Sequence, residues 1–288
     1  MLKFLDEFFI QGILDFFRYK FLFNALLAGL IVGLTCSILS VYVVLKRLAF
    51  IGLGISHSAL GGIALGLLLF QVGQSSTVIP VYITALVFCI AVAIFISAVT
   101  RNQKVSLDSA IGIFFAFSMA LGIILFSLQK KYSSDLFSYL FGSIIAVTNA
   151  DLTIMIILGI IILLTVILFY KEFFYYLFDE EMAYVSGIPV TFIHYLLITL
   201  LSLTIVLSVR IIGIILISAF LVIPGATAQI LTSHFKKMII ISIIIGILSS
   251  ILGLMCANYF SIPSGSSIVV VLFLVFIIVL VLRREKIR

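Results

Sequence analysis

The chain has 288 residues, of which 64% are hydrophobic and only 10% are charged. Soluble domains carry about 25% charged residues, so this composition, with a mean hydropathy of +1.43, excludes an ordinary soluble protein. The net charge of +6 does not indicate nucleic-acid binding, because the basic residues lie in short loops and at the C-terminus, where they act as topology signals.

Nine apolar runs predict an all-α membrane protein, a polytopic bundle of eight or nine transmembrane helices. Lipid offers an open sheet no hydrogen-bond partners, so helices are the expected spans. The connection at 209–212 is so short that a broken neighbouring run, leaving eight full spans, stays an alternative. We treat residues 1–288 as a single transmembrane domain. The runs cover 22–45, 52–70, 78–99, 107–128, 151–170, 190–209, 211–232, 238–258 and 266–282.

Residues 1–20 are predicted to form a helix in the membrane interface, because phenylalanines recur at helical spacing and acidic residues interrupt any signal peptide.

The distribution of basic residues predicts the orientation of the spans. If connections alternate, 11 of the 17 basic residues share one side, which the positive-inside rule makes cytoplasmic together with the C-terminus. These are Lys46, Arg47, Arg101, Lys104, Lys171, Lys236, Lys237, Arg283, Arg284, Lys286 and Arg288.

Residues 171–189 form the longest predicted cytoplasmic segment. Asp179 precedes a short helix of about two to three turns, with Glu180 and Glu181 in its first turn, and Gly187 follows it. Such a helix is either a docking element for a partner or a surface connector between two spans. The residue types alone favour neither interpretation.

The segment FLVIPGATA, residues 220–228, interrupts an apolar run. Pro224 has no backbone N–H and strains the preceding turn, so this helix should kink or break. Breaks are tolerated in lipid where they line a cavity or are buried in protein. The break is therefore either a functional hinge or a packing feature.

His57 is the one histidine inside an uncharged run of small residues, GLGISHSALGGIALG at 52–66. Gly54, Gly61 and Ala64 share its helix face. A neutral imidazole is a good ligand for a transition metal, and ionisable groups at membrane depth often mark pathways. The competing interpretation is a structural histidine that hydrogen-bonds across a tight helix pair.

The motifs and the other titratable residues of the chain do not indicate an enzyme. The chain lacks a phosphate-binding GxxxxGK[ST] loop and an HExxH motif. Ser56 and His57 are adjacent, so they project about 100° apart on a helix and form no dyad by themselves. Asp108 and Asp135 are predicted near helix N-termini. A membrane-embedded enzyme using Ser56, His57 or Asp108 would need a second catalytic group that the sequence does not supply.

Six segments, in order along the chain, resemble the integral permeases of ABC importers for zinc, manganese and iron(II), and look closest to the zinc branch. They are LKRLAFIGLGISHSALGGIALG (45–66), DSAIGIFFAFSMALGI (108–123), DLFSYLFGSIIAVT (135–148), FDEEMAYVSGIPV (178–190), GIILISAFLVIPGATAQIL (213–231) and PSGSSIVVVL (263–272).

The resemblance implies a transport subunit, not an enzyme. It implies a multi-pass protein of the inner membrane of a bacterial cell. It implies a homodimer that forms the translocation path, cytoplasmic ABC ATPases that consume the ATP, and an extracytoplasmic metal-binding protein. No cofactor is expected to stay bound. The expected cargo is Zn²⁺, with manganese, iron(II) or a metal chelate as alternatives. A subunit that only packs, without a pathway, is a further alternative.

The resemblance also assigns site residues. Segment 178–190 matches the helix that couples the permease to its ATPase, which favours the docking interpretation. The residues it places there are Asp179, Glu180, Glu181, Met182 and Gly187. His57 matches a histidine of the metal path, but Leu53 stands where many relatives carry an aspartate, so we expect transient contact and no high-affinity metal site. Pro224 and Gly225 would absorb part of the motion driven by ATP.

Overall fold

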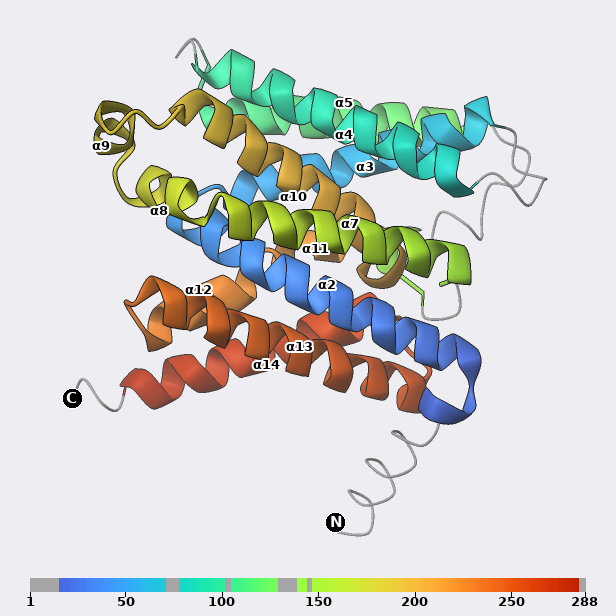
Figure 1. The fold of residues 1–288 in the computed structure, drawn as a ribbon. Coiled ribbons are helices and arrows are strands. Elements are labelled where there is room, and N and C mark those ends of the chain that lie inside the picture. The colour runs from blue at the N-terminus through green and yellow to red at the C-terminus, as the bar shows by residue number, and fades with distance from the viewer. Residues whose placement is uncertain (1–15, 71–77, 102–104, 129–138, 144–146, 285–288) are drawn as a thin grey trace. The chain divides into compact units, whose positions relative to one another are not determined.

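The computed structural model describes residues 16–70, 78–101, 105–128, 139–143 and 147–284. The secondary-structure elements in these ranges are all helices, which confirms the all-α prediction (Figure 1). Nine helical stretches in these ranges are long and apolar enough to cross a membrane. The elements are α2 (Lys20–Leu45), α3 (Ala49–Leu69), α4 (Val78–Arg101), α5 (Leu107–Ser127), α7 (Asn149–Leu168), α8 (Tyr170–Phe178), α9 (Glu180–Val185), α10 (Val190–Ile212), α11 (Ile214–Phe220), α12 (Ile223–Leu231), α13 (Phe235–Phe260) and α14 (Ser264–Arg284).

The chain divides into two compact units. The terminal unit comprises Met1–Val41, Phe137–Ile156 and Ser208–Arg288, and the middle unit comprises Tyr42–Leu136 and Ile157–Leu207. Helices α2, α7 and α10 each begin in one unit and end in the other. The predicted interfacial segment at the N-terminus lies mostly outside the described residues, as does Asp135.

In the middle unit, α3 packs against both α4 and α5, and Figure 1 shows the three helices side by side. Glycines of α3 make this possible. A Cβ on Gly62 would lie 2.7 Å from Cα of Ala85 in α4, and one on Gly61 would lie 3.0 Å from the carbonyl oxygen of Ser118 in α5. Small residues allow such close backbone approach in membrane helices. Gly61 belongs to the small-residue face predicted around His57, so that face packs against α5.

In the terminal unit, a buried hydroxyl joins α13 to α2, and a side-chain cap begins α7. Ser242 Oγ in α13 donates to the carbonyl oxygen of Ser37 in α2 at 2.7 Å. At the start of α7, Thr148 N and Oγ1 both donate to Asp151 Oδ2, at 2.9 and 2.7 Å. The bond from Thr148 N satisfies a backbone donor that the start of a helix leaves without an intrahelical partner.

The broken span is the run predicted at 211–232. Helix α10 continues through the predicted 209–212 connection to Ile212, and the chain reverses at Gly213, whose φ of +82° suits a glycine. Helix α11 ends at Phe220, and α12 begins at Ile223 with Pro224 in its first turn. Proline is tolerated there because the N–H it lacks would have no intrahelical partner. The predicted break is confirmed, and it lies at residues 221–222.

Candidate functional site

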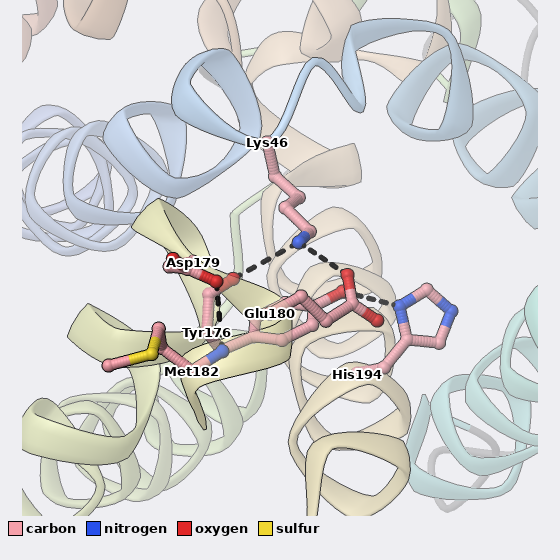
Figure 2. Close-up of polar contacts among 6 residues, drawn as sticks. All are labelled: Lys46, Tyr176, Asp179, Glu180, Met182 and His194. Carbon is pink, nitrogen blue, oxygen red and sulfur yellow. Dashed lines mark hydrogen bonds and ion pairs between the residues drawn. The ribbon is translucent and has the colours of Figure 1, made fainter. Parts of the chain in front are cut away.

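The segment between α7 and α10 folds as two short helices. Asp179 caps α9, because its Oδ1 accepts a hydrogen bond from the backbone N–H of Met182 at 2.9 Å (Figure 2). Helix α9 has six residues, fewer than the predicted two to three turns. Gly187, with φ of +80°, follows it. Five of the six α9 residues are exposed, and only Ala183 is buried.

Helix α8 was not predicted as a separate element. Its buried residues Phe173, Tyr176 and Leu177 follow the i, i+3, i+4 spacing of an amphipathic helix, which is the signal that the sequence carried. The Phe173 ring meets the fully buried Tyr42 ring edge-on, with centroids 5.4 Å apart. This contact fixes α8 to the end of α2.

Lys46, just after α2, joins both short helices (Figure 2). Its Nζ lies 2.8 Å from Glu180 Oε2 of α9 and donates to the backbone carbonyl of Tyr176 at 3.0 Å. It also sits 4.0 Å from the centroid of the Tyr176 ring, a cation–π distance. The Lys46 side chain is only 20% exposed, against 55% for Glu180. The lysine is thus the less solvated partner of this pair.

His194 of α10 links the same cluster to α4. Its Nδ1 lies 2.7 Å from the Tyr176 hydroxyl and its Nε2 lies 3.2 Å from Ser97 Oγ. Burial, and then the charge of Glu180, raise the pKa of Tyr176 above its usual value. The phenol therefore stays protonated at neutral pH and can donate to Nδ1, which assigns the ring proton to Nε2. His194 thus links α8 and α4 through the two nitrogens of its ring.

His57 lies on α3 and is 9% exposed. Its Nδ1 is 3.1 Å from the carbonyl oxygen of Leu53 in the same helix, and its ring centroid is 4.5 Å from that of Phe115 in α5. Because a carbonyl only accepts, Nδ1 carries the proton and Nε2 keeps its lone pair. A ring fixed in this way by a backbone carbonyl is typical of metal-binding histidines.

In the described part of the chain, the hydrogen-bond contacts of His57 are to Leu53 and Ser56 of its own helix. Leu53 supplies its backbone carbonyl to the histidine. Within the described residues, no group of three or more His, Cys, Asp or Glu side chains is placed to hold a metal ion. Any contact with a metal at His57 would have to be completed by water or by groups from elsewhere.

Pro224 and Gly225 belong to the terminal unit, where Gly225 is pinned to α2. Its backbone N–H donates to Ser40 Oγ at 2.7 Å, and a Cβ on this glycine would meet the Ser40 backbone at 2.5–2.6 Å. Gly225 is therefore an anchored position. Any bending at this break falls on the turn at Leu221 and Val222, which precedes α12.

Comparison with known proteins decides the family. The model of the ABC 3 transport family matches residues 18–283 of this chain. The chain belongs to the ABC 3 transport family. Among its relatives is the manganese import system permease protein ScaB of Streptococcus gordonii, 38% identical over 94% of this chain and 93% of the relative. The manganese transport system membrane protein MntC of Halalkalibacterium halodurans is 36% identical over 88% of this chain and 84% of the relative.

Solved structures agree with the assignment to the ABC 3 family. The structure titled "PsaBC from Streptococcus pneumoniae in complex with Fab" superposes with a TM-score of 0.84 at 37% identity, and covers 94% of this chain and 95% of that one. A putative metal-chelate type ABC transporter in an inward-facing conformation shares the fold, with a TM-score of 0.73 at 16% identity. The ABC 3 chain is thus a multi-pass transport subunit and carries no ATPase motif of its own.

Proposed function

We propose that the chain is the permease subunit of an ATP-driven manganese importer in a bacterial cell membrane. The observation that carries this proposal is the near full-length match to permeases named for manganese, such as the S. gordonii protein. The names of the relatives favour manganese over the zinc that the sequence segments suggested. Two copies of the permease would enclose the path, with ABC ATPases on the cytoplasmic side and a metal-binding protein outside.

The order of spans supports an orientation. Four spans, α10, the α11–α12 pair, α13 and α14, follow the α8–α9 segment. If each crosses the membrane, the C-terminus shares a side with α9, and the 11 basic residues named above fall on that side. The positive-inside rule makes it cytoplasmic. Helix α9 then faces the ATPase, and Asp179, Glu180, Glu181, Met182 and Gly187 are its proposed coupling residues.

Within this proposal, His57 lines the metal path and the break before Pro224 and Gly225 accommodates motion. The lone pair of His57 Nε2 supports the first assignment. Zinc stays the second candidate because of one observation: Leu53 offers no carboxylate beside the imidazole. Imidazole suits zinc and iron, whereas manganese prefers carboxylate oxygen.

The test uses a strain that lacks the chain, grown at limiting metal and complemented with the wild-type protein. Cellular manganese, zinc and iron are measured together. Restored manganese content supports the main proposal, and restoration of zinc alone supports the second candidate. No change in any metal, with the protein present in the membrane, would refute both.

The His57→Ala variant tests the path. We expect it to lose uptake at limiting metal while it still assembles with the ATPase. The matched control is His234→Ala, since His234 is exposed at the start of α13 and its side chain makes no capping bond there. Normal uptake by the His57 variant would remove the residue from the path.

A further inference from the structure

Helix α9 is held in place by few side-chain contacts of its own. Of its residues, only Ala183 is buried. Glu180 and His194 line a cavity of about 290 Å³ beside it, so packing does not fix α9 on that side. If a partner ATPase moves α9, this short helix needs another connection to pass the movement on to the membrane helices.

Lys46 supplies such a connection. It contacts the carboxylate of Glu180 in α9, and it contacts both the carbonyl and the ring of Tyr176 in α8. The two acceptors are separated from Lys46 by 134 and 130 residues along the chain. One side chain therefore bridges both short helices to the corner between α2 and α3.

The corner itself is tightly formed. Arg47 adopts φ of +58°, and the backbone N–H of Leu48 donates to the carbonyl of Val43 at 2.8 Å. Helix α3, which carries His57, begins at Ala49 directly after this turn. A displacement at Lys46 thus reaches the first turn of α3 through a connection of only three residues.

The Tyr176 hydroxyl continues the connection to two further helices. It bonds to His194 of α10, and the other ring nitrogen of His194 lies within hydrogen-bond distance of Ser97 in α4. The cluster of Lys46, Tyr176, Glu180, His194 and Ser97 therefore joins α9 to the ends of α3, α4 and α10.

We propose that Lys46 is a positioning residue for transport, which ties the coupling helix α9 to the α2–α3 corner so that movement of α9 displaces α3 and His57. The link from Tyr176 through His194 to Ser97 makes α4 and α10 move with them. This inference rests on the proposed function, because it requires an ATPase that acts on α9.

The test measures ⁵⁴Mn uptake and ATP hydrolysis by the complete transporter in proteoliposomes. Lys46→Met keeps the length and apolar stem of the side chain but removes its charge. We expect it to lower manganese transported per ATP about 5- to 10-fold, the factor that an ion pair and a cation–π contact together carry. Lys46→Arg should retain most of the coupling, since the guanidinium keeps both contacts. Co-purification with the ATPase should be unchanged.

Three further variants separate the contacts. Glu180→Gln removes only the ion pair, and Tyr176→Phe removes only the hydroxyl, so each should lower the coupling ratio less than Lys46→Met. Combining Glu180→Gln with Lys46→Met should lower the ratio no further than Lys46→Met alone, because the pair is already broken. Lys237→Met is the control, an exposed lysine at the start of α13, and should leave the ratio unchanged.

The outcomes are distinguishable. If the wild-type transporter moves no manganese, the proposed function fails whatever the variants do. If it transports and Lys46→Met shows the wild-type ratio, the positioning role of Lys46 is overturned. If Lys46→Met fails to assemble, Glu180→Gln and Tyr176→Phe decide, and normal ratios in both would overturn the inference.

Discussion

The packing of α3 against α4 can be tested by Gly62→Ala. A Cβ at this position would lie 2.7 Å from Cα of Ala85 and 3.1 Å from its carbonyl oxygen. Ordinary van der Waals contact begins at 3.4 Å, so the α4 backbone must give way by about 0.7 Å. The third near atom is Phe88 Cβ, at 3.0 Å. None of the three atoms is the end of a flexible side chain, so none can move aside without the α4 backbone. The added methyl therefore has to push the two helices apart.

The magnitude follows from two opposing effects. Overpacking a well-packed interior destabilises by about 1–3 kcal/mol, whereas replacing glycine by alanine within a helix stabilises by up to about 1 kcal/mol. Gly112→Ala in α5 is the matched control, because a Cβ there meets nothing within 4 Å. It should show only the helix-propensity gain. The difference between the two variants isolates the clash and should be about 1–3 kcal/mol.

The assay is unfolding in mixed detergent micelles, followed by circular dichroism, with the free energy of unfolding compared between the two variants. Gly62→Ala should also lower metal uptake, because α3 carries His57 and its spacing from α4 has changed. Equal unfolding free energies for Gly62→Ala and Gly112→Ala would refute the reasoning, since they would mean that α3 and α4 are not in backbone contact at this position.

Three further outcomes follow from the same contacts. Asp179→Ala removes the cap on the Met182 N–H, so α9 should lose about 0.5–2 kcal/mol of stability and less ATPase should co-purify, while Asp179→Asn should behave like the wild type. Ser40→Ala leaves the buried N–H of Gly225 unpaired, which should lower the free energy of unfolding by about 1–3 kcal/mol in a denaturant titration. Val222→Cys, in a background without other cysteines, should label at a nucleotide-dependent rate, and equal rates with and without nucleotide would count against a hinge at this break.

Hydropathy alone indicated that the chain has eight or nine spans and that these spans are helices. Lipid obliges each spanning segment to satisfy its own backbone, so apolar runs of sufficient length become helices. Nine runs gave nine candidate spans in the described residues. Local chemistry also determined the break before Pro224 and the capping of α9 by Asp179, because both depend on neighbouring residues along one stretch of chain.

The connection at 209–212 was misjudged for a related reason. Arg210 resembled the end of a span, but α10 continues to Ile212, and the reversal falls on Gly213. A single charged residue close to a helix end does not terminate a helix, whereas a backbone position that requires positive φ does. Helix α8 was overlooked because residues 171–178 were assigned to the cytoplasmic segment before Asp179, although Phe173, Tyr176 and Leu177 carry the spacing of an amphipathic helix.

Only the tertiary structure decided which residues act together. Lys46 and Glu180 are 134 residues apart, and Ser40 and Gly225 are 185 apart, so no local pattern pairs them. The sequence marked His57 as an unusual residue at membrane depth, but its bond to Leu53 and its contact with Phe115 depend on how α3 packs. The sequence thus specified the helices and the residues with reactive side chains. Packing specified their partners, because contacts between distant segments form only when helices close on one another.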